Sequence, residues 1–357
     1  MVQRKRLLYI NFLQTIGVLL VIIGHSLEPY VYTDYLGENF IINEKCEQLY
    51  KFIYSFHIPL FFFLYGYLFA YREQSLISWT DYTKKRFKRL IIPFYLFALF
   101  IWIPFLHFYI GRTNAAEDFL SFKDCQHLWF LPTLFIIGLI HSAIIKTPLR
   151  KHLILLLILL LLWQCNHYDR GMLETLYTRP INNIVYAHVG FMVATYITRA
   201  KEHQISDKAV LKMMCFLLGI LFLINDFQLE LKLSLNLQTI INNWQLNVFL
   251  PILKLSVIFK IMFLYTATKI ILIWSPRLVD NKITQIVSEN MLTIYLVHQG
   301  FNWIFYKTLH NTLKVASIYS ITGIVILTLL ASIIVAIMKN YVLEEIVKRN
   351  QTKRRFL

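Results

Sequence analysis

The amino-acid sequence predicts an all-α membrane protein, a polytopic bundle of about ten transmembrane helices with its N- and C-termini in the cytoplasm. Of its 357 residues, 57% are hydrophobic and 16% are charged, whereas soluble domains contain about 25% charged residues. The mean hydropathy is +0.54, and several apolar stretches approach the roughly 20 residues that cross a hydrocarbon core. These three observations exclude a disordered chain, a secreted disulfide scaffold and an ordinary soluble enzyme.

Ten apolar stretches are predicted to span the membrane. The first is too long for a signal peptide and has no small-residue cleavage site after it, so we expect it to be retained. No linker, internal repeat or appended soluble domain is evident, so residues 1–357 are predicted to form a single domain. The predicted spans are residues 7–27, 52–71, 90–110, 127–145, 152–166, 183–198, 211–225, 246–272, 286–306 and 318–338.

The charged residues set the predicted orientation. With a cytoplasmic N-terminus, 25 of the 36 Lys and Arg residues lie in inner segments and 9 in outer segments, as the positive-inside rule requires. The same rule accounts for the net charge of +16, so the expected partner of these cations is membrane lipid and not nucleic acid. The four Cys residues show no CxxC spacing, which indicates neither a zinc site nor a disulfide framework. We expect a multi-pass protein of a cell membrane, in the first place the bacterial cytoplasmic membrane.

A polar stripe runs along the first predicted helix. Asn11, Gln14 and His25 are separated by 3 and 11 positions, and at about 100° per residue these spacings put all three on one face. Because polar groups are costly in hydrocarbon, this face should point into the bundle, and an ionisable group there suggests a function. Two interpretations of His25 stay open at this point, a hydrogen bond to a neighbouring helix and a role in chemistry.

Three other histidines are predicted in the outer half of the membrane, where His25 also lies. His57 is expected to open the second helix, with Pro59 in its first turn, and His127 the fourth. At about 1.5 Å per residue, His298 lies roughly 18 Å along the ninth helix. These imidazoles would either reach interfacial water or form a site. No metal cluster is expected, because the sequence has no HxxH or HxxxH pair and no Asp or Glu residues that converge with these histidines.

Five cations occur within six residues between the second and third predicted helices. Arg86 and Arg89 are three positions apart, so on a helix they would share a face and hold one polyanion, with guanidinium groups suited to phosphate. The alternative is ordinary anchoring to anionic lipid. An inner phosphate-like site combined with outer histidines favours chemistry divided across the membrane. The cations are Lys84, Lys85, Arg86, Lys88 and Arg89.

Five segments of the chain carry a family resemblance. They are residues 16–26 (IGVLLVIIGHS), 55–69 (SFHIPLFFFLYGYLF), 86–93 (RFKRLIIP), 127–132 (HLWFLP) and 292–298 (LTIYLVH). Together they resemble the acyltransferase 3 family of integral membrane acyltransferases, and most closely its fucose 4-O-acetyltransferase-like branch. Each segment alone is loose and apolar, but the five occur in family order and span nearly the whole chain.

The resemblance implies a membrane-embedded O-acyltransferase and names its substrates. It implies transfer of an acetyl or other short acyl group from cytoplasmic acetyl-CoA, or another acyl-CoA, to a hydroxyl of a cell-surface or lipid-linked carbohydrate. His25 matches the essential histidine, and Arg86 and Arg89 match the arginine pair associated with the CoA donor. Lys85 and Lys88, which lie beside them in the sequence, are further candidates for binding acyl-CoA. Polysaccharide modification is the implied process, with no tightly bound cofactor and no metal, and glycan-assembly proteins are candidate partners.

The chain departs from the family pattern at three positions. Family members usually carry Arg or Lys where Gln14 stands, and Asp where Asn11 stands. Two amides at i,i+3 avoid the desolvation cost of a buried ion pair, so we interpret them as a compensated replacement. Tyr65 stands where Ser is usual.

In the expected mechanism, His25 is the general base that deprotonates the acceptor hydroxyl for attack on the thioester. An acyl-imidazole intermediate is the alternative. Supporting polar groups would donate to the developing oxyanion or orient the imidazole. The candidates for this support are Asn11, Gln14, His57, Glu28 and His298.

Two other classes of function remain open on the sequence. One is a transporter of polysaccharide or lipid-linked glycan, although transporters often show paired repeats and interrupted helices. The other is a non-catalytic partner of a glycan-assembly complex, which the amides at Asn11 and Gln14 would fit if they mark lost activity.

Overall fold

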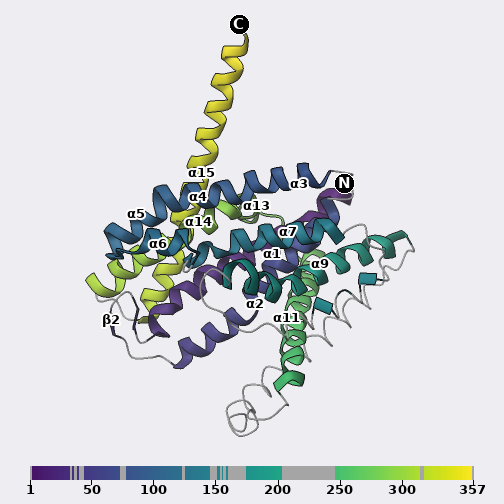
Figure 1. Ribbon diagram of the computed structural model, residues 1–357, viewed down its shortest axis with the longest axis horizontal. Helices are drawn as coiled ribbons and strands as arrows, with labels where there is room; N and C mark the ends of the chain where they lie inside the picture. The colour runs from purple at the N-terminus through teal and green to yellow at the C-terminus, as the bar shows by residue number, and fades with distance from the viewer. Residues whose placement is uncertain are drawn as a thin grey trace. The chain divides into compact units, whose positions relative to one another are not determined.

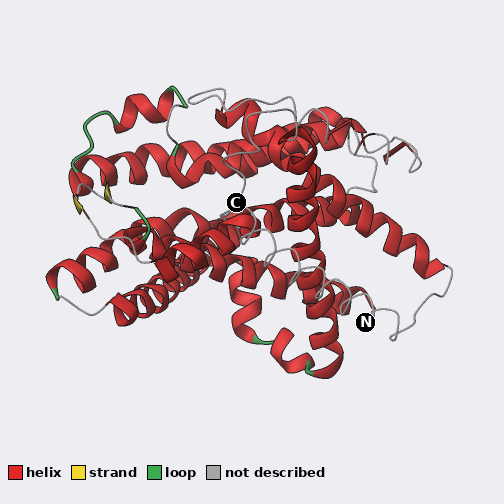
Figure 2. Cartoon of the chain, turned by 90° about the horizontal axis from the view of Figure 1, so that it is seen from below, coloured by secondary structure: helices red, strands yellow, loops and turns green. Residues whose placement is uncertain are grey.

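In the computed structural model, the described residues are almost entirely helical, as the red ribbons of Figure 2 show. Strands β1 (Asp34–Tyr35) and β2 (Glu38–Asn39) form a two-stranded antiparallel pair. The structure describes residues 2–32, 34–35, 38–39, 44–72, 78–122, 125–144, 151–152, 155, 158–159, 174–202, 246–313 and 317–355.

The helices differ widely in length. The longer ones are α1 (Val2–Leu27), α2 (Glu44–Arg72), α7 (Phe130–Ile144), α9 (Arg179–Glu202), α11 (Leu246–Trp274), α14 (Met291–Tyr306) and α15 (Ser317–Arg355). The shorter ones are α3 (Trp79–Arg86), α4 (Ile92–Phe97), α5 (Ile103–Phe105), α6 (Ala115–Leu120), α12 (Pro276–Val279) and α13 (Lys282–Glu289).

Six helical segments of the described chain are long and apolar enough to cross a membrane, which supports a multi-pass membrane protein. They correspond to six of the ten predicted spans. The predicted span 211–225 and most of 152–166 lie outside the described residues, and the count of ten and the orientation of the termini remain predictions. The six segments are Leu8–Tyr30, Glu44–Ala70, Trp79–Ile110, Gln126–Ala143, Ser256–Trp274 and Tyr319–Ile346.

The second helix is longer than its apolar stretch. The prediction that it begins at residue 52 is wrong, because α2 begins at Glu44. Glu44 and Glu47 lie in its first turn, where acidic side chains interact favourably with the positive end of the helix dipole. His57 and Pro59 therefore lie inside α2 and do not open it.

The ninth predicted span, residues 286–306, is not one helix. Asn290 separates α13 from α14 with φ −109° and ψ 15°. Its side-chain amide donates to the backbone carbonyl of Ile286 at 2.9 Å, and such local bonds offer the backbone an alternative to a continuous helix.

The chain forms two compact units, one of residues 1–54 and 275–357 and the other of residues 55–274. In the first unit, α1 packs against α13, α14 and α15, and α14 runs beside α15. Ile10 and Ile22 of α1 and Ile324 of α15 are fully buried. Because lipid is as apolar as these side chains, close packing and hydrogen bonds hold such helices together.

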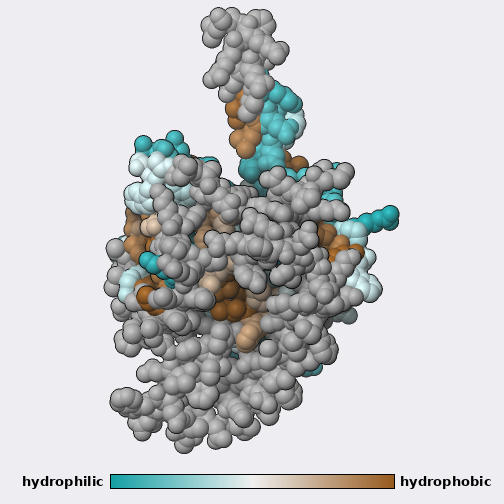
Figure 3. Space-filling view, turned by 90° about the vertical axis from the view of Figure 1, so that its right-hand side faces the viewer, coloured by the Kyte–Doolittle hydropathy of each residue, from teal (hydrophilic) through white to brown (hydrophobic). Residues whose placement is uncertain are grey.

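Helix α15 is the longest helix of the described chain, and its C-terminal part extends beyond the other helices of its unit (Figure 1). Hydrophobic and hydrophilic side chains lie next to one another on this extension (Figure 3). Met338 and Val342 are among the exposed apolar residues of α15.

In the second unit, the backbones of α2 and α9 approach each other closely at two glycines. A Cβ at Gly66 would collide with the carbonyl of Ala187, and a Cβ at Gly190 with the carbonyl of Phe63. Small residues at such crossings let membrane helices pack at short range. The crossing holds the middle of α2 against the helix that carries His188.

Candidate active site

His25 lies in the last turn of α1, where the helix gives way to a 3₁₀ turn at Glu28–Tyr30. Pro29 favours this change because proline has no backbone N–H to continue the α-helical ladder. The tight turn brings Glu28 Oε1 to 2.6 Å from His25 Nδ1. Both side chains are mostly buried, with exposed fractions of 16% and 13%, so solvent screens the pair only weakly.

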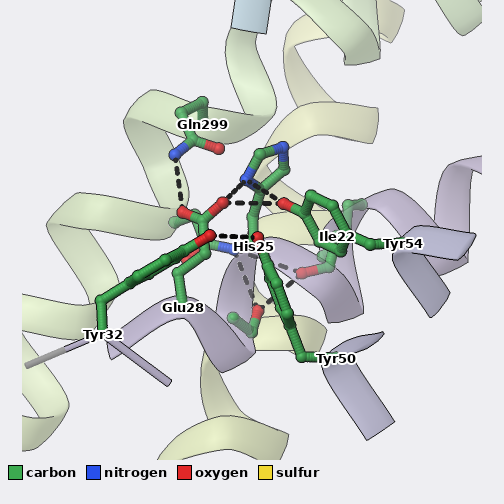
Figure 4. A network of polar contacts seen from close by, with 9 residues as sticks. Ile22, His25, Glu28, Tyr32, Tyr50, Tyr54 and Gln299 are labelled. Carbon is green, nitrogen blue, oxygen red and sulfur yellow. Dashed lines mark hydrogen bonds and ion pairs between the residues drawn. The ribbon is translucent and has the colours of Figure 1, made fainter. Parts of the chain in front are cut away.

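Two side chains from other helices hold the Glu28 carboxylate (Figure 4). The Tyr54 hydroxyl of α2 donates to Oε1 at 2.7 Å, and the Gln299 amide of α14 donates to Oε2 at 3.4 Å. The Tyr54 oxygen also lies 3.3 Å from His25 Nδ1. The carboxylate is therefore fixed from three directions, which in turn fixes the imidazole ring.

A tyrosine ladder, made of Tyr54, Tyr50 and Tyr32, begins at this carboxylate (Figure 4). The rings of Tyr50 and Tyr54, one helical turn apart on α2, are stacked with centroids 3.9 Å apart. The hydroxyls of Tyr32 and Tyr50 lie 2.7 Å apart, and Tyr32 is 46% exposed. The network thus runs from a mostly buried histidine to an exposed phenol.

A second set of bonds ties α14 to the end of α1. The Asn302 amide donates to the Ser26 hydroxyl at 2.9 Å, and Ser26 donates to the Ile22 carbonyl at 2.8 Å. Gly24, on the same turn, leaves room for Tyr54, since a Cβ there would lie 2.8 Å from Tyr54 Cε2. Ser26 and Gly24 therefore allow α14 and α2 to pack closely against the end of α1.

His298 of α14 lies beside His25. The two ring centroids are 5.2 Å apart, and His298 Nδ1 lies 2.7 Å from the carbonyl oxygen of Tyr295. The sequence predicted both histidines in the outer half of the membrane, and the structure brings these two together.

This arrangement resembles a base and its orienting group. When a neutral His25 donates from Nδ1 to Glu28, the lone pair of Nε2 is left to accept a proton. Among the described residues, none forms a hydrogen bond with Nε2. An imidazole held on one side by a carboxylate and open on the other is the geometry of a general base.

The comparison with family models supplies the deciding observation. The acyltransferase domain model of the acyltransferase 3 family matches residues 7–337. The chain belongs to the acyltransferase 3 family. The predicted membership is confirmed, and together with the six candidate spans it supports a membrane acyltransferase. No curated protein and no solved structure matches the chain.

In this acyltransferase, the predicted basic residues occupy different environments. Arg86 is half-buried, with its guanidinium carbon 4.8 Å from the Tyr65 ring centroid and 5.2 Å from that of Tyr82. Arg89 is exposed, in the π-helical turn Phe87–Ile91 that follows α3. Two aromatic rings thus hold the Arg86 side chain in place. The remaining members of the cluster, Lys84, Lys85 and Lys88, are exposed.

Two predicted supporting residues of the acyltransferase lie far from His25 along the same helix. Gln14 and Asn11 lie on α1 at about 16 Å and 21 Å from His25 along the helix axis, at about 1.5 Å per residue. His57 is buried in the second unit. Within the described chain, no three His, Cys, Asp or Glu side chains are arranged as a metal site.

The sequence did not single out Tyr50, Tyr54, Gln299 or Asn302. Tyr50 and Tyr54 are four positions apart, which is the helical spacing that would have paired them, but Tyr50 lies before the predicted span 52–71. Gln299 directly follows the predicted His298. Asn302 is one turn further along the same helix, so the spacing from His298 was the available signal.

Proposed function

We propose that this protein is a membrane-embedded O-acyltransferase that moves an acetyl or other short acyl group from acyl-CoA to a hydroxyl of a cell-surface or lipid-linked carbohydrate. The observation that carries the proposal is the contact of 2.6 Å between His25 Nδ1 and Glu28, which leaves Nε2 to act as the base. The resemblance to the fucose 4-O-acetyltransferase-like branch supports a sugar hydroxyl as the acceptor, and the bacterial cytoplasmic membrane is the proposed location.

The proposed step conserves every proton. Nε2 of His25 takes the proton of the acceptor hydroxyl, the oxygen attacks the thioester carbonyl, and the carbon–sulfur bond breaks. The proton then passes from the imidazolium to the thiolate, which leaves as free CoA. The Glu28 carboxylate stabilises the transient imidazolium, and general-base assistance of this kind contributes about 10² to 10⁴ in rate.

The basic residues are proposed to hold the donor. CoA carries phosphates that match the guanidinium groups of Arg86 and Arg89 and the ammonium groups of Lys85 and Lys88. The contact of Arg86 with two aromatic rings limits its conformations, so less entropy is lost when a phosphate binds.

The test makes two measurements on the purified protein in liposomes. The first is thiol release from acetyl-CoA, with and without carbohydrate extracted from the surface of the expressing cells. The second is acetylation of that carbohydrate, measured by mass spectrometry. His25→Ala should lower both by about 10² to 10⁴, whereas His107→Ala, a change at an exposed histidine, should not. The double variant Arg86→Ala with Arg89→Ala should raise KM for acetyl-CoA. Wild-type rates in a folded His25→Ala protein would end the assignment of the base. Absence of acetyl-CoA-dependent thiol release from the wild type would favour a transporter or a non-catalytic role.

A further inference from the structure

Three histidines outside the His25 network gather in the second unit. His141 of α7, His188 of α9 and His152 are each no more than 1% exposed. The ring centroids of His141 and His188 are 5.8 Å apart, with an angle of 24° between the ring planes. Those of His152 and His188 are 5.1 Å apart, with an angle of 35°. The proposed reaction at His25 makes no use of them.

This cluster keeps unused hydrogen-bonding capacity. Neither ring nitrogen of His141 has a hydrogen-bond partner among the described residues. His188 Nε2 lies 3.2 Å from the His152 carbonyl, but its Nδ1 likewise has no partner in the described chain. Buried polar groups are almost always hydrogen-bonded, so these nitrogens call for a polar occupant.

Aromatic rings lie around the imidazole of His141. Phe69 and Phe191 lie 5.6 and 6.1 Å from His141, and Tyr65 lies 6.3 Å from it at an interplanar angle of 21°. An occupant must therefore present apolar groups next to a donor and an acceptor.

The cluster continues directly to Arg86. The guanidinium of Arg86 lies over the ring of Tyr65, and the Tyr65 hydroxyl is 3.1 Å from that of Tyr82. Gly138 of α7 faces both hydroxyls, and a Cβ there would lie 2.7 Å and 3.0 Å from them. A half-buried cation, two phenols and a buried imidazole thus follow one another from the edge of the unit to its interior.

We propose that His141 and His188 bind the part of the CoA donor next to its diphosphate, the section of the pantetheine arm that carries two methyl groups, a hydroxyl and the first amide. This inference rests on the proposed function and adds a second half to the donor site. Arg86 holds phosphate, the rings of Phe69 and Phe191 receive the methyl groups, and the imidazoles bind the hydroxyl and the amide. A secondary amide offers one donor and one acceptor, which is what a neutral imidazole offers in return.

The first test measures CoA binding directly. Binding of CoA to the purified protein in lipid nanodiscs is compared with and without His141→Phe, in a His25→Ala background that slows turnover. His141→Phe keeps a ring but removes both polar atoms, so it should weaken binding about tenfold. His141→Gln, which restores a donor and an acceptor, should recover most of it, and His107→Phe should change nothing. Equal CoA affinity in the His141→Phe and parent proteins overturns the inference.

The second test separates contact with the donor from a structural effect. S-acetyl-N-acetylcysteamine is a truncated donor that retains the thioester and lacks the hydroxyl, the first amide and the phosphates. In active protein, His141→Phe should raise KM for acetyl-CoA with kcat within about twofold, and should leave kcat/KM for the truncated donor unchanged. An equal loss with both donors would mean that His141 is structural and would overturn the inference. Loss of acyl transfer in His25→Ala with normal CoA binding concerns only the proposed function.

Discussion

Replacing Glu28 tests whether the carboxylate orients His25. In Glu28→Ala, the His25 Nδ1–H and the Tyr54 hydroxyl lose the acceptor that they share. A buried donor left without a partner costs about 1 to 3 kcal/mol, and the imidazole is then free to adopt the tautomer with its proton on Nε2, which cannot accept another. We expect the rate of acyl transfer to fall about 10²-fold, since about 1.4 kcal/mol corresponds to tenfold.

Glu28→Gln should be milder for a structural reason. The Gln oxygen can still accept from His25 and Tyr54, and its amide would face the Gln299 side chain, which now donates to Oε2. The Gln299 oxygen has no hydrogen-bond partner within the described chain, so a flip of the Gln299 amide would satisfy the new donor. What is lost is the charge, and a charged hydrogen bond exceeds a neutral one by about 1 kcal/mol. The expected loss in rate is about tenfold or less.

The assay is thiol release from acetyl-CoA in the presence of acceptor, for Glu28→Gln, Glu28→Ala, His25→Ala and the double variant of Glu28→Ala with His25→Ala. If Glu28 acts only through His25, the double variant is no slower than His25→Ala alone. Two results would refute the reasoning: losses that multiply in the double variant, or a wild-type rate in folded Glu28→Ala when His25→Ala is inactive.

Further predictions concern neighbouring contacts. Tyr54→Phe keeps the ring stacked on Tyr50 but loses the hydrogen bond to Glu28, so kcat should fall several-fold with KM for acetyl-CoA unchanged. Tyr32→Phe, at the exposed end of the ladder, should leave kcat within about twofold in the same steady-state measurement. Gly66→Ala places a methyl against the backbone of α9 and should lower thermal stability in detergent by about 1 to 3 kcal/mol, seen as a lower Tm. Arg86→Lys keeps the charge but loses the planar contact with two rings, so KM for acetyl-CoA should rise while kcat stays near its original value; an unchanged KM would contradict the donor site.

The sequence predicted the first half of the candidate site because that half is local. The spacing of Asn11, Gln14 and His25 placed the histidine on the polar face of one helix, and Glu28 follows three residues later, so helical geometry alone puts them in reach of each other. No tertiary contact was needed for this step. The same local reasoning could not separate His25 from the amides in function, although about 16 Å of helix axis lies between Gln14 and His25.

The second half depends on packing between distant segments. Gln299 and Glu28 are 271 positions apart in the sequence, and Asn302 and Ser26 are 276 apart. Hydrophobic periodicity does not predict contacts between residues so far apart in the sequence. Tyr50 was hidden for a different reason, because it precedes the predicted span 52–71. A helix predicted from hydropathy begins where the apolar stretch begins, whereas α2 also includes polar turns before that stretch.

The tyrosine ladder is best explained as a support for the base and not as a route for protons. In the proposed reaction the proton removed from the acceptor hydroxyl ends on the CoA thiol, so one turnover neither releases a proton nor consumes one. A relay from Glu28 through Tyr54 and Tyr50 to the exposed Tyr32 would have no net proton to carry. The hydroxyl of Tyr54 instead holds the carboxylate that holds the imidazole, and the influence of each hydroxyl should decline with its distance from His25. A large loss of kcat in Tyr32→Phe, equal to that in Tyr54→Phe, would show that proton movement along the ladder limits the rate.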